Sequence, residues 1–340
     1  MKALIIDRNS QTRFDDIPEP SIKEGEVLVS VEYVGLCGSD LNTWRGLNPL
    51  VVYPCLPGHE IGGTVMQVAE DVTKCQVGDR VTILPYTACG ECSSCKKGRP
   101  NACKYNQTLG VQRQGGMVRK LAVPFQKALV CNQLNSRQLA LIEPLSVGLH
   151  AARRGAINVG EWVVIIGCGV IGLGTIAAAA AMGARVIAVD IDDRKEAVAL
   201  ACGATRFINS SKSDLVEIAG GLDEGRGPSL VIEAVGLSST IELAVDLVAF
   251  AGRIVYVGYA KKPVTFDSAI FLLKELDIRG SRGATEADFR AVIALMEQNR
   301  YPVELLISAY YPLGKADRAL EHWASDPGAV TKILVELQSE

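Results

Sequence analysis

Residues 163–172 read VVIIGCGVIG, and this stretch determines how the middle of the chain folds. A branched aliphatic run predicts a strand, three glycines follow in Gly-x-Gly-x-x-Gly spacing, and the Ala-rich segment 171–182 predicts a helix. In such a unit the first glycine permits a tight turn, the second lets a pyrophosphate approach the backbone, and the third allows close helix packing. The helix N-terminus offers unpaired amides and the positive end of its dipole to phosphates. The candidate phosphate-binding residues are Gly167, Gly169, Val170, Ile171 and Gly172; a glycine-rich turn without a ligand is the alternative.

Asp190 ends the next strand-like run, and its carboxylate is placed to select the nucleotide. A carboxylate at this position accepts hydrogen bonds from the adenosine ribose and repels a 2′-phosphate. The sequence therefore predicts NAD as the cofactor in preference to NADP. Arg194 and Lys195 lie close behind and weaken this preference slightly, because nearby cations could accommodate that phosphate; Arg194 is a further candidate cofactor contact.

The alternation of strand and helix continues for more than a hundred residues beyond this turn. Apolar, β-branched runs at 185–189, 230–234 and 253–257 have the character of strands buried on both faces, with helical segments at 194–202 and 239–251 between them. This pattern predicts a parallel, doubly wound sheet. We expect residues 146–285 to form a Rossmann NAD-binding domain.

The first part of the chain has a different, all-β texture. Short strand-like runs at 2–7, 26–34, 63–68 and 80–83 are separated by Pro and Gly turn signals, which predicts a compact β domain over residues 1–145. The run at 332–337 resembles these strands more than those of the parallel sheet. We therefore expect residues 286–340 to return to the first domain.

Size and composition favour a two-domain enzyme of the cytoplasm. At 340 residues the chain exceeds one comfortable core, 48% of it is hydrophobic, and its net charge is only -3. Without a basic cluster, a nucleic-acid partner is not expected. The N-terminal residues meet a charge before an apolar run could form a signal or membrane anchor, so we expect no membrane partner and a cytoplasmic location.

Four of the ten cysteines are clustered in residues 89–103. Thiols of a cytoplasmic protein stay reduced, so a tight cluster indicates metal binding rather than disulfides. Four thiolates leave no open coordination position, which predicts a structural zinc held by Cys89, Cys92, Cys95 and Cys103. An iron-sulfur cluster is the competing reading, although neither ferredoxin spacing fits.

A second candidate metal site is built from different residue types. His59 and Glu60 are adjacent in a chain with only three histidines, with Cys37 upstream and Glu143 far downstream. A thiolate, an imidazole and carboxylate oxygens are all zinc ligands, and three protein ligands can leave a position for water or substrate. The alternative for an isolated His-Glu pair is a solvated loop.

A dinucleotide fold implies hydride transfer, and an open zinc site implies a Lewis acid that acts on an alcohol or carbonyl, so together they describe an alcohol dehydrogenase. The chain resembles the zinc-containing medium-chain dehydrogenases over essentially its whole length. The motifs that carry this resemblance are 35–40 (GLCGSD), 58–60 (GHE), the cysteines of 89–103, 143–148 (EPLSVG) and the loop 167–172. Within the family it is similar to the polyol, threonine and sugar-acid branch. Residues 85–89, 141–144 and 280–285 narrow the similarity to the L-galactonate and L-gulonate 5-dehydrogenases.

The resemblance implies a GroES-like β domain beside the Rossmann domain, two zinc ions per chain, and a homodimer or homotetramer. By motif, Cys37, His59 and Glu60 would hold the catalytic zinc, with Glu143 as a fourth ligand or one that exchanges with water. Ser39, Glu60 and Asn42 are the candidate catalytic residues, and Ser39 would pass on the alcohol proton. Relatives of this branch commonly have a histidine where this chain has Asn42, so proton exit would depend on water, the cofactor ribose or Glu143, and His150 cannot be assumed to substitute.

The implied reaction is the reversible, NAD-dependent oxidation of a secondary alcohol in a sugar acid, at C5 of L-galactonate or L-gulonate, to the keto acid. Arg282, and after it Arg45, is the candidate cation for the substrate carboxylate, and Trp44 could shape the pocket. A sorbitol or galactitol type of polyol dehydrogenase is the main alternative. A threonine dehydrogenase or a catalytically idle NAD-sensing protein are less favoured alternatives.

Overall fold

The computed structural model describes residues 1–338 and divides into two compact units. Unit 1 contains Met1–Pro144, Thr285–Glu297 and the segment from Ile307 onward, and unit 2 contains Leu145–Ala284 and Gln298–Leu306. The segment 298–306, which we expected in the first domain, groups with unit 2, where Tyr301 and Leu306 are buried. Among residues 1–338 we find no helix that is both long and apolar enough to cross a membrane.

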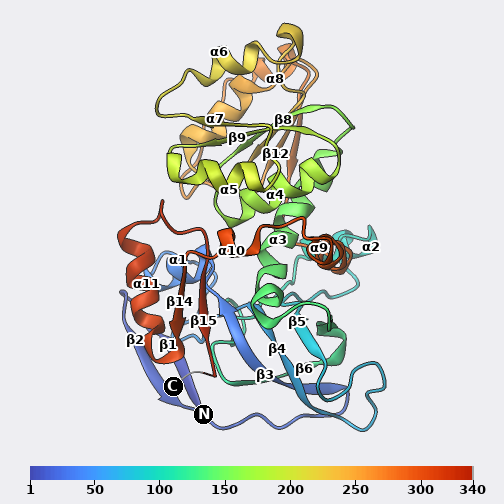
Figure 1. Ribbon diagram of the computed structural model, residues 1–340, viewed down its shortest axis with the longest axis vertical. Coiled ribbons are helices and arrows are strands. Elements are labelled where there is room, and N and C mark those ends of the chain that lie inside the picture. Colours follow the sequence, from blue (N-terminus) through green and yellow to red (C-terminus); the bar gives the residue numbers. More distant parts are fainter. Residues whose placement is uncertain (339–340) are drawn as a thin grey trace. The chain divides into compact units, whose positions relative to one another are not determined.

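Unit 1 is built on a seven-stranded sheet whose central strand, β3, is ten residues long (Figure 1). The path β14-β15-β3-β4-β5-β7 is joined by β6, which pairs with β3, and β1 and β2 form a separate antiparallel pair. The bounds are β1 Lys2–Ile6, β2 Thr12–Asp16, β3 Glu26–Gly35, β4 Glu60–Val68, β5 Arg80–Ile83, β6 Lys120–Pro124, β7 Ala128–Val130, β14 Ala309–Pro312 and β15 Ile333–Glu336. Because β15 pairs with β3, the end of the described chain completes the sheet that its beginning starts.

The core of unit 1 follows from the residue pattern of these strands. Val27, Val29 and Val31 alternate along β3 and are fully buried, as expected where side chains of a strand project to opposite faces. Helix α11 (Ala316–Ser325) buries Ala316, Ala319 and Leu320, a spacing that places all three on one face of a helix. The other helices of this unit are α1 (Gly38–Trp44), α2 (Ser93–Lys96) and α9 (Glu286–Glu297).

Unit 2 is a six-stranded, all-parallel sheet in the order β10-β9-β8-β11-β12-β13. Its strands are β8 Trp162–Ile166, β9 Arg185–Asp190, β10 Arg206–Asn209, β11 Leu230–Glu233, β12 Arg253–Tyr256 and β13 Asp277–Gly280. Its helices are α4 Val170–Ala181, α5 Glu196–Ala201, α6 Leu215–Gly220, α7 Ser238–Leu247, α8 Ala269–Leu273 and α10 Val303–Leu306. The chain turns back at β8, which lies between β9 and β11, so the ligand crevice of such a sheet is expected at the carboxyl end of β8. The predicted α/β fold class, a GroES-like domain with a Rossmann domain, is confirmed.

Two local elements differ from the sequence pattern. Strand β4 begins at Glu60 rather than near residue 63, because Glu60 pairs with Gly35 of β3 in the sheet. The segment 136–155, to which the sequence analysis assigned no element, is the long helix α3 (Ser136–Gly155), with Pro144 in its interior. An interior proline is uncommon in a helix because it has no amide hydrogen to donate to the preceding turn.

Candidate metal and cofactor sites

The ends of β3 and β4 bring the first candidate metal ligands together. Cys37 follows β3 at the N-cap of α1, whereas His59 and Glu60 lie at the start of β4, and the antiparallel register pairs Gly35 with Glu60. One ligand atom from each of Cys37, His59 and Glu60 lies within 4.8 Å of the others. His59 and Glu60 are buried and Cys37 is half-buried, so the alternative of a solvated loop does not apply.

Glu143 reaches the same interior region from α3. Its side chain is buried, and it acts electrostatically on both His59 and Glu60. The hydroxyl of Tyr86, three residues beyond β5, donates a hydrogen bond to its Oε1 atom. Burial raises the pKa of Glu143, an effect partly offset by His59. The structure therefore brings Cys37, His59 and Glu60 within ligand distance of one another and places Glu143 close enough to interact with His59 and Glu60, although Glu143 is not part of that cluster. It also adds a tyrosine that the sequence analysis did not suggest.

Lys332 is a second residue that the sequence analysis missed. Its ammonium group lies 2.7 Å from Oε1 and 2.5 Å from Oε2 of Glu60, donates a further hydrogen bond of 2.8 Å to the carbonyl of Leu36, and is only 1% exposed. A buried carboxylate requires such a partner. The signal in the sequence is the lone Lys332 immediately before the apolar strand β15 (Ile333–Glu336).

Several buried polar atoms at this site have no hydrogen-bond partner among the described residues: Ser39 Oγ, Asp40 Oδ1 and His59 Nδ1. His59 Nδ1 lies 4.0 Å from Asp40 Oδ1. Burial lowers the pKa of His59, but Cys37 and Asp40 outweigh it and the net shift is well upward, whereas burial raises the pKa of Asp40. Unpaired donors and acceptors beside several buried acids fit a bound cation, and the thiol, imidazole and carboxylate set fits zinc.

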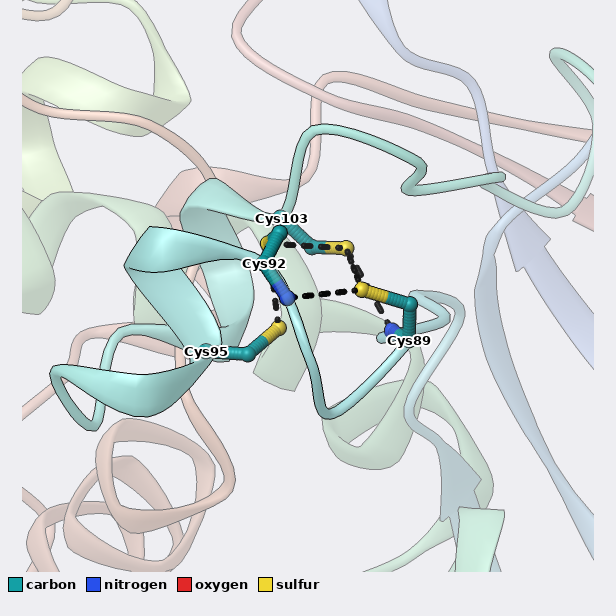
Figure 2. Close-up of side chains that lie close together, drawn as sticks. All are labelled: Cys89, Cys92, Cys95 and Cys103. Atoms are coloured by element: carbon teal, nitrogen blue, oxygen red, sulfur yellow. Dashed lines mark hydrogen bonds between the residues drawn. The ribbon is translucent and has the colours of Figure 1, made fainter.

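The four side chains of the cysteine lobe lie close together (Figure 2); Cys89 is exposed, Cys92 and Cys95 are half-buried, and Cys103 is buried. Sulfur–sulfur separations are 3.5 Å for Cys92 and Cys95, 3.9 Å for Cys92 and Cys103, and 3.6 Å for Cys89 and Cys103. These are far longer than a disulfide of about 2.05 Å and match the edge of roughly 3.8 Å expected of a tetrahedron with zinc–sulfur bonds of about 2.3 Å. The chemistry of these four thiols fits a closed zinc site.

The lobe already stabilises negative sulfur. Backbone amides of Cys89 and Tyr105 each approach the Cys103 sulfur to 3.3 Å. The Ser94 hydroxyl, 3.1 Å from the Cys92 sulfur, and nearby amides lower the pKa of Cys92 to about 5. Desolvation and the neighbouring Cys92 raise the pKa of Cys95 to about 11. A positive centre, such as a metal ion, would be needed to ionise all four thiols near neutral pH.

The nucleotide loop has the backbone geometry that its glycines suggested. Gly167 has a φ of +100°, and a Cβ atom at Gly172 would lie 1.8 Å from the carbonyl oxygen of Gly167. A Cβ at Gly169 would meet nothing within 4 Å, so this backbone is open to a ligand. Val170 and Ile171 start α4, and the N-cap Gly169 has no side chain to bond their amides. The loop fits a pyrophosphate.

Asp190 ends β9 next to this loop. Its carboxylate accepts hydrogen bonds from the amides of Cys168 at 2.7 Å and Ile191 at 2.8 Å, which fix its orientation. The exposed Arg194 pairs with Asp192 at 2.6 Å. Lys195, the second nearby cation, is buried close by; burial lowers its pKa and Asp190 opposes that shift.

The remaining candidates are more dispersed. Trp44 is half-buried against the core of unit 1, and Arg45 donates a hydrogen bond of 3.3 Å to the carbonyl of Ala324. Asn42 is half-buried on α1, five residues after the N-cap Cys37. Arg282 is exposed after β13 in unit 2, and His150 lies on the part of α3 that belongs to unit 2, whereas the ligand cluster belongs to unit 1.

A dinucleotide loop on a doubly wound sheet, together with a buried thiol, imidazole and carboxylate set in a β unit, defines a zinc-type dehydrogenase. Residues 23–133 match the alcohol dehydrogenase GroES-like domain, and residues 170–298 match the zinc-binding dehydrogenase domain. The chain belongs to the zinc-type alcohol dehydrogenase family and is an oxidoreductase that acts on CH–OH groups. The membership expected from the motifs, including the polyol branch, is confirmed.

Two of the relatives are named for a sugar acid and for a polyol. The chain is 34% identical to L-galactonate-5-dehydrogenase of Escherichia coli strain K12, with 87% of each chain covered. It is 31% identical to sorbitol dehydrogenase of Halalkalibacterium halodurans, with 98% and 99% covered. A zinc-binding dehydrogenase from Sinorhizobium meliloti 1021, solved with bound NADP, superposes with a TM-score of 0.89 at 30% identity and 99% coverage of both chains.

Proposed function

We propose that this enzyme uses zinc and NAD to oxidise, reversibly, a secondary alcohol of a sugar acid, at C5 of an L-galactonate or L-gulonate type substrate, and that it works in the cytoplasm. The observation that carries the reaction is the buried cluster of Cys37, His59 and Glu60 with ligand atoms within 4.8 Å. The substrate class is supported by the 34% identity to L-galactonate-5-dehydrogenase. A dehydrogenase for uncharged polyols is the second candidate, supported by the similarity to sorbitol dehydrogenase.

In this proposal Cys37, His59 and Glu60, with Glu143 as a fourth or exchanging ligand, hold one zinc, and Cys89, Cys92, Cys95 and Cys103 hold the other. The first zinc would supply Lewis acidity to the substrate oxygen when bound. Ser39 offers a buried hydroxyl without a partner, which can accept the alcohol proton and donate its own onward. Lys332 neutralises one of the buried carboxylates, which limits repulsion within the ligand set.

A substrate panel tests the sugar-acid assignment. We expect galactonate, gulonate or idonate to give the highest kcat/KM for NAD reduction, above sorbitol, galactitol and threonine. Arg282→Met and Arg45→Met each remove a guanidinium that could pair with the carboxylate; losing that pair should cost about 1.5–3 kcal/mol, roughly 10- to 100-fold in kcat/KM, for acids only. Best turnover on uncharged polyols would reject the sugar-acid proposal, and no turnover of any alcohol would favour the idle NAD-sensing alternative.

The preference for NAD is a separate proposal, resting on Asp190 at the end of β9. Its carboxylate would bind the ribose hydroxyls of NAD and repel the phosphate of NADP. Asp190→Ala should reduce the NAD to NADP ratio of kcat/KM by about tenfold or more, since hydrogen bonds to a charged group are lost. An unchanged ratio would move the ribose contact elsewhere, and the NADP-bound relative makes this measurement necessary.

We also propose a homodimer, or a tetramer built from such dimers, formed through the open edge of the unit 2 sheet. β13 is an edge strand, and its Ile278 is 45% exposed. Leu272 and Leu273, at the end of the preceding helix α8, are 81% and 65% exposed. In antiparallel pairing of two β13 strands about Ile278, each Asp277 would face the Arg279 of the other copy. Ile278→Asp should shift the mass measured by light scattering to that of the monomer; an unchanged mass would place the interface elsewhere.

A further inference from the structure

Tyr86 is held firmly at the edge of the ligand cluster. Its ring meets that of Phe289 edge-on, with centroids 6.5 Å apart and planes at 87°. Its carbonyl accepts a hydrogen bond of 2.7 Å from Lys127, and the preceding Pro85 carbonyl accepts one of 3.2 Å from Arg113. The phenol is thus anchored at the ring and at the backbone, while its hydroxyl donates to Oε1 of Glu143.

The acceptor of this hydrogen bond is a buried carboxylate that lies among other buried acids. Glu143 is only 5% exposed and lies in a region that already contains the buried acids Asp40 and Glu60. Lys332 makes its ion pair with Glu60 rather than with Glu143. The tyrosine hydroxyl is therefore the side-chain donor that the structure gives to Glu143, and it engages one of the two oxygens.

We propose that Tyr86 is a positioning residue that keeps Oε1 of Glu143 away from the metal, so that Glu143 can offer zinc one oxygen at most. This inference rests on the proposed function, which puts Glu143 at the catalytic zinc. A carboxylate freed of its hydrogen bond can bind a cation through both oxygens. It would then occupy a position that the substrate oxygen needs, because catalytic zinc sites function by keeping one position open.

Tyr86→Phe tests this with minimal disturbance, since it keeps the ring and the contact with Phe289 and removes only the hydroxyl. The matched control is Tyr301→Phe, which removes a buried hydroxyl that has no hydrogen-bond partner among the described residues. Zinc release to a chelator and the visible spectrum of the cobalt-substituted enzyme report on the metal, and kcat and KM are measured in parallel. The spectrum of Cys37→Ser, which retains only the four-cysteine site, is subtracted.

We expect Tyr86→Phe to slow release of the catalytic metal and lower kcat, each by about tenfold or more, because a hydrogen bond to a charged group is lost. The cobalt bands should weaken as the coordination number rises. In a Glu143→Ala background the same substitution should change nothing further. Tyr301→Phe should resemble the parent enzyme. Release and spectra equal to those of Tyr301→Phe, or faster release, would overturn the proposal.

The same experiment separates the two levels of inference. If Cys37→Ser still binds two zinc ions per chain, the proposed catalytic site is wrong. If Cys37→Ser loses one zinc while Tyr86→Phe leaves the metal unaffected, the site stands and only the role of Tyr86 is rejected.

Discussion

The two candidate metal sites of unit 1 solve the problem of concentrated negative charge in opposite ways. The lobe gathers four thiols from residues 89–103, near the exposed cations Lys96, Lys97 and Arg99, and uses backbone amides and Ser94 to stabilise sulfur. The mixed site gathers its groups from widely separated segments, buries them, and pairs Glu60 with the buried Lys332. The comparison teaches that a ligand set close in sequence can rely on solvent and backbone, whereas a buried catalytic set needs specific side chains from distant parts of the chain.

The largest expected effect distinguishes the roles of the two sites. Cys37→Ser should lower kcat/KM by at least about a thousandfold, since a metal Lewis acid contributes several kcal/mol to transition-state stabilisation. The protein should stay folded, bind NAD and keep one zinc. Cys95→Ser should instead lose the other zinc and loosen the lobe, because a structural zinc contributes directly to folding. Metal content per chain, NAD binding and limited proteolysis measure these outcomes.

Cys202→Ala is the control, because Cys202 is a buried cysteine of unit 2 outside both clusters. It should keep both metals and near-parental activity. A folded lobe in Cys95→Ser together with lost turnover, or an unfolded lobe in Cys37→Ser, would reverse the two assignments.

An intermediate effect is expected from the buried ion pair. Lys332→Met leaves the charge of Glu60 buried without its partner, which should reduce the free energy of unfolding of unit 1 by about 3–5 kcal/mol. Lys120→Met breaks the ion pair with Glu19, whose carboxylate side chain is 57% exposed, and should change the free energy of unfolding far less, because solvent screens exposed ion pairs. Urea unfolding followed by hydrogen exchange within unit 1 compares the two. Equal losses would mean that another cation, such as the zinc, already compensates Glu60.

The smallest effect concerns thiol reactivity after zinc has been removed from the lobe. Because the pKa of Cys92 is lowered to about 5, its thiolate predominates at every pH above that value, whereas Cys95, with a pKa of about 11, stays protonated through neutral pH. Iodoacetamide should therefore label Cys92 well before Cys95 at about pH 6–7, as read by peptide mass spectrometry. This pH range lies at least about one unit above the pKa of Cys92 and well below that of Cys95. Ser94→Ala should raise the pKa of Cys92 and delay its labelling. Equal labelling of both cysteines would contradict this asymmetry.

What could be predicted from sequence follows the same division. The glycine loop at 167–172 and the cysteines of 89–103 are local patterns whose spacing carries the chemistry, so they were found directly. The partners Lys332 and Tyr86 were not, because their roles depend on contacts across 272 and 57 positions of sequence. No element was expected at helix α3, where the packing of many buried residues outweighs the unfavourable interior Pro144.

The insertion of β15 beside β3 has a consequence for synthesis on the ribosome. The sheet of unit 2 draws all its strands from 145–284, so it can form as soon as that segment has emerged. The sheet of unit 1 is complete only after residues 332–336, close to the end of the chain, pair with β3. Glu60 can form its ion pair with Lys332 only then. Contacts so distant in sequence form slowly, so the nascent chain would carry the complete sheet of unit 2 beside an unfinished ligand cluster. Metal loading would then be one of the last events in its maturation.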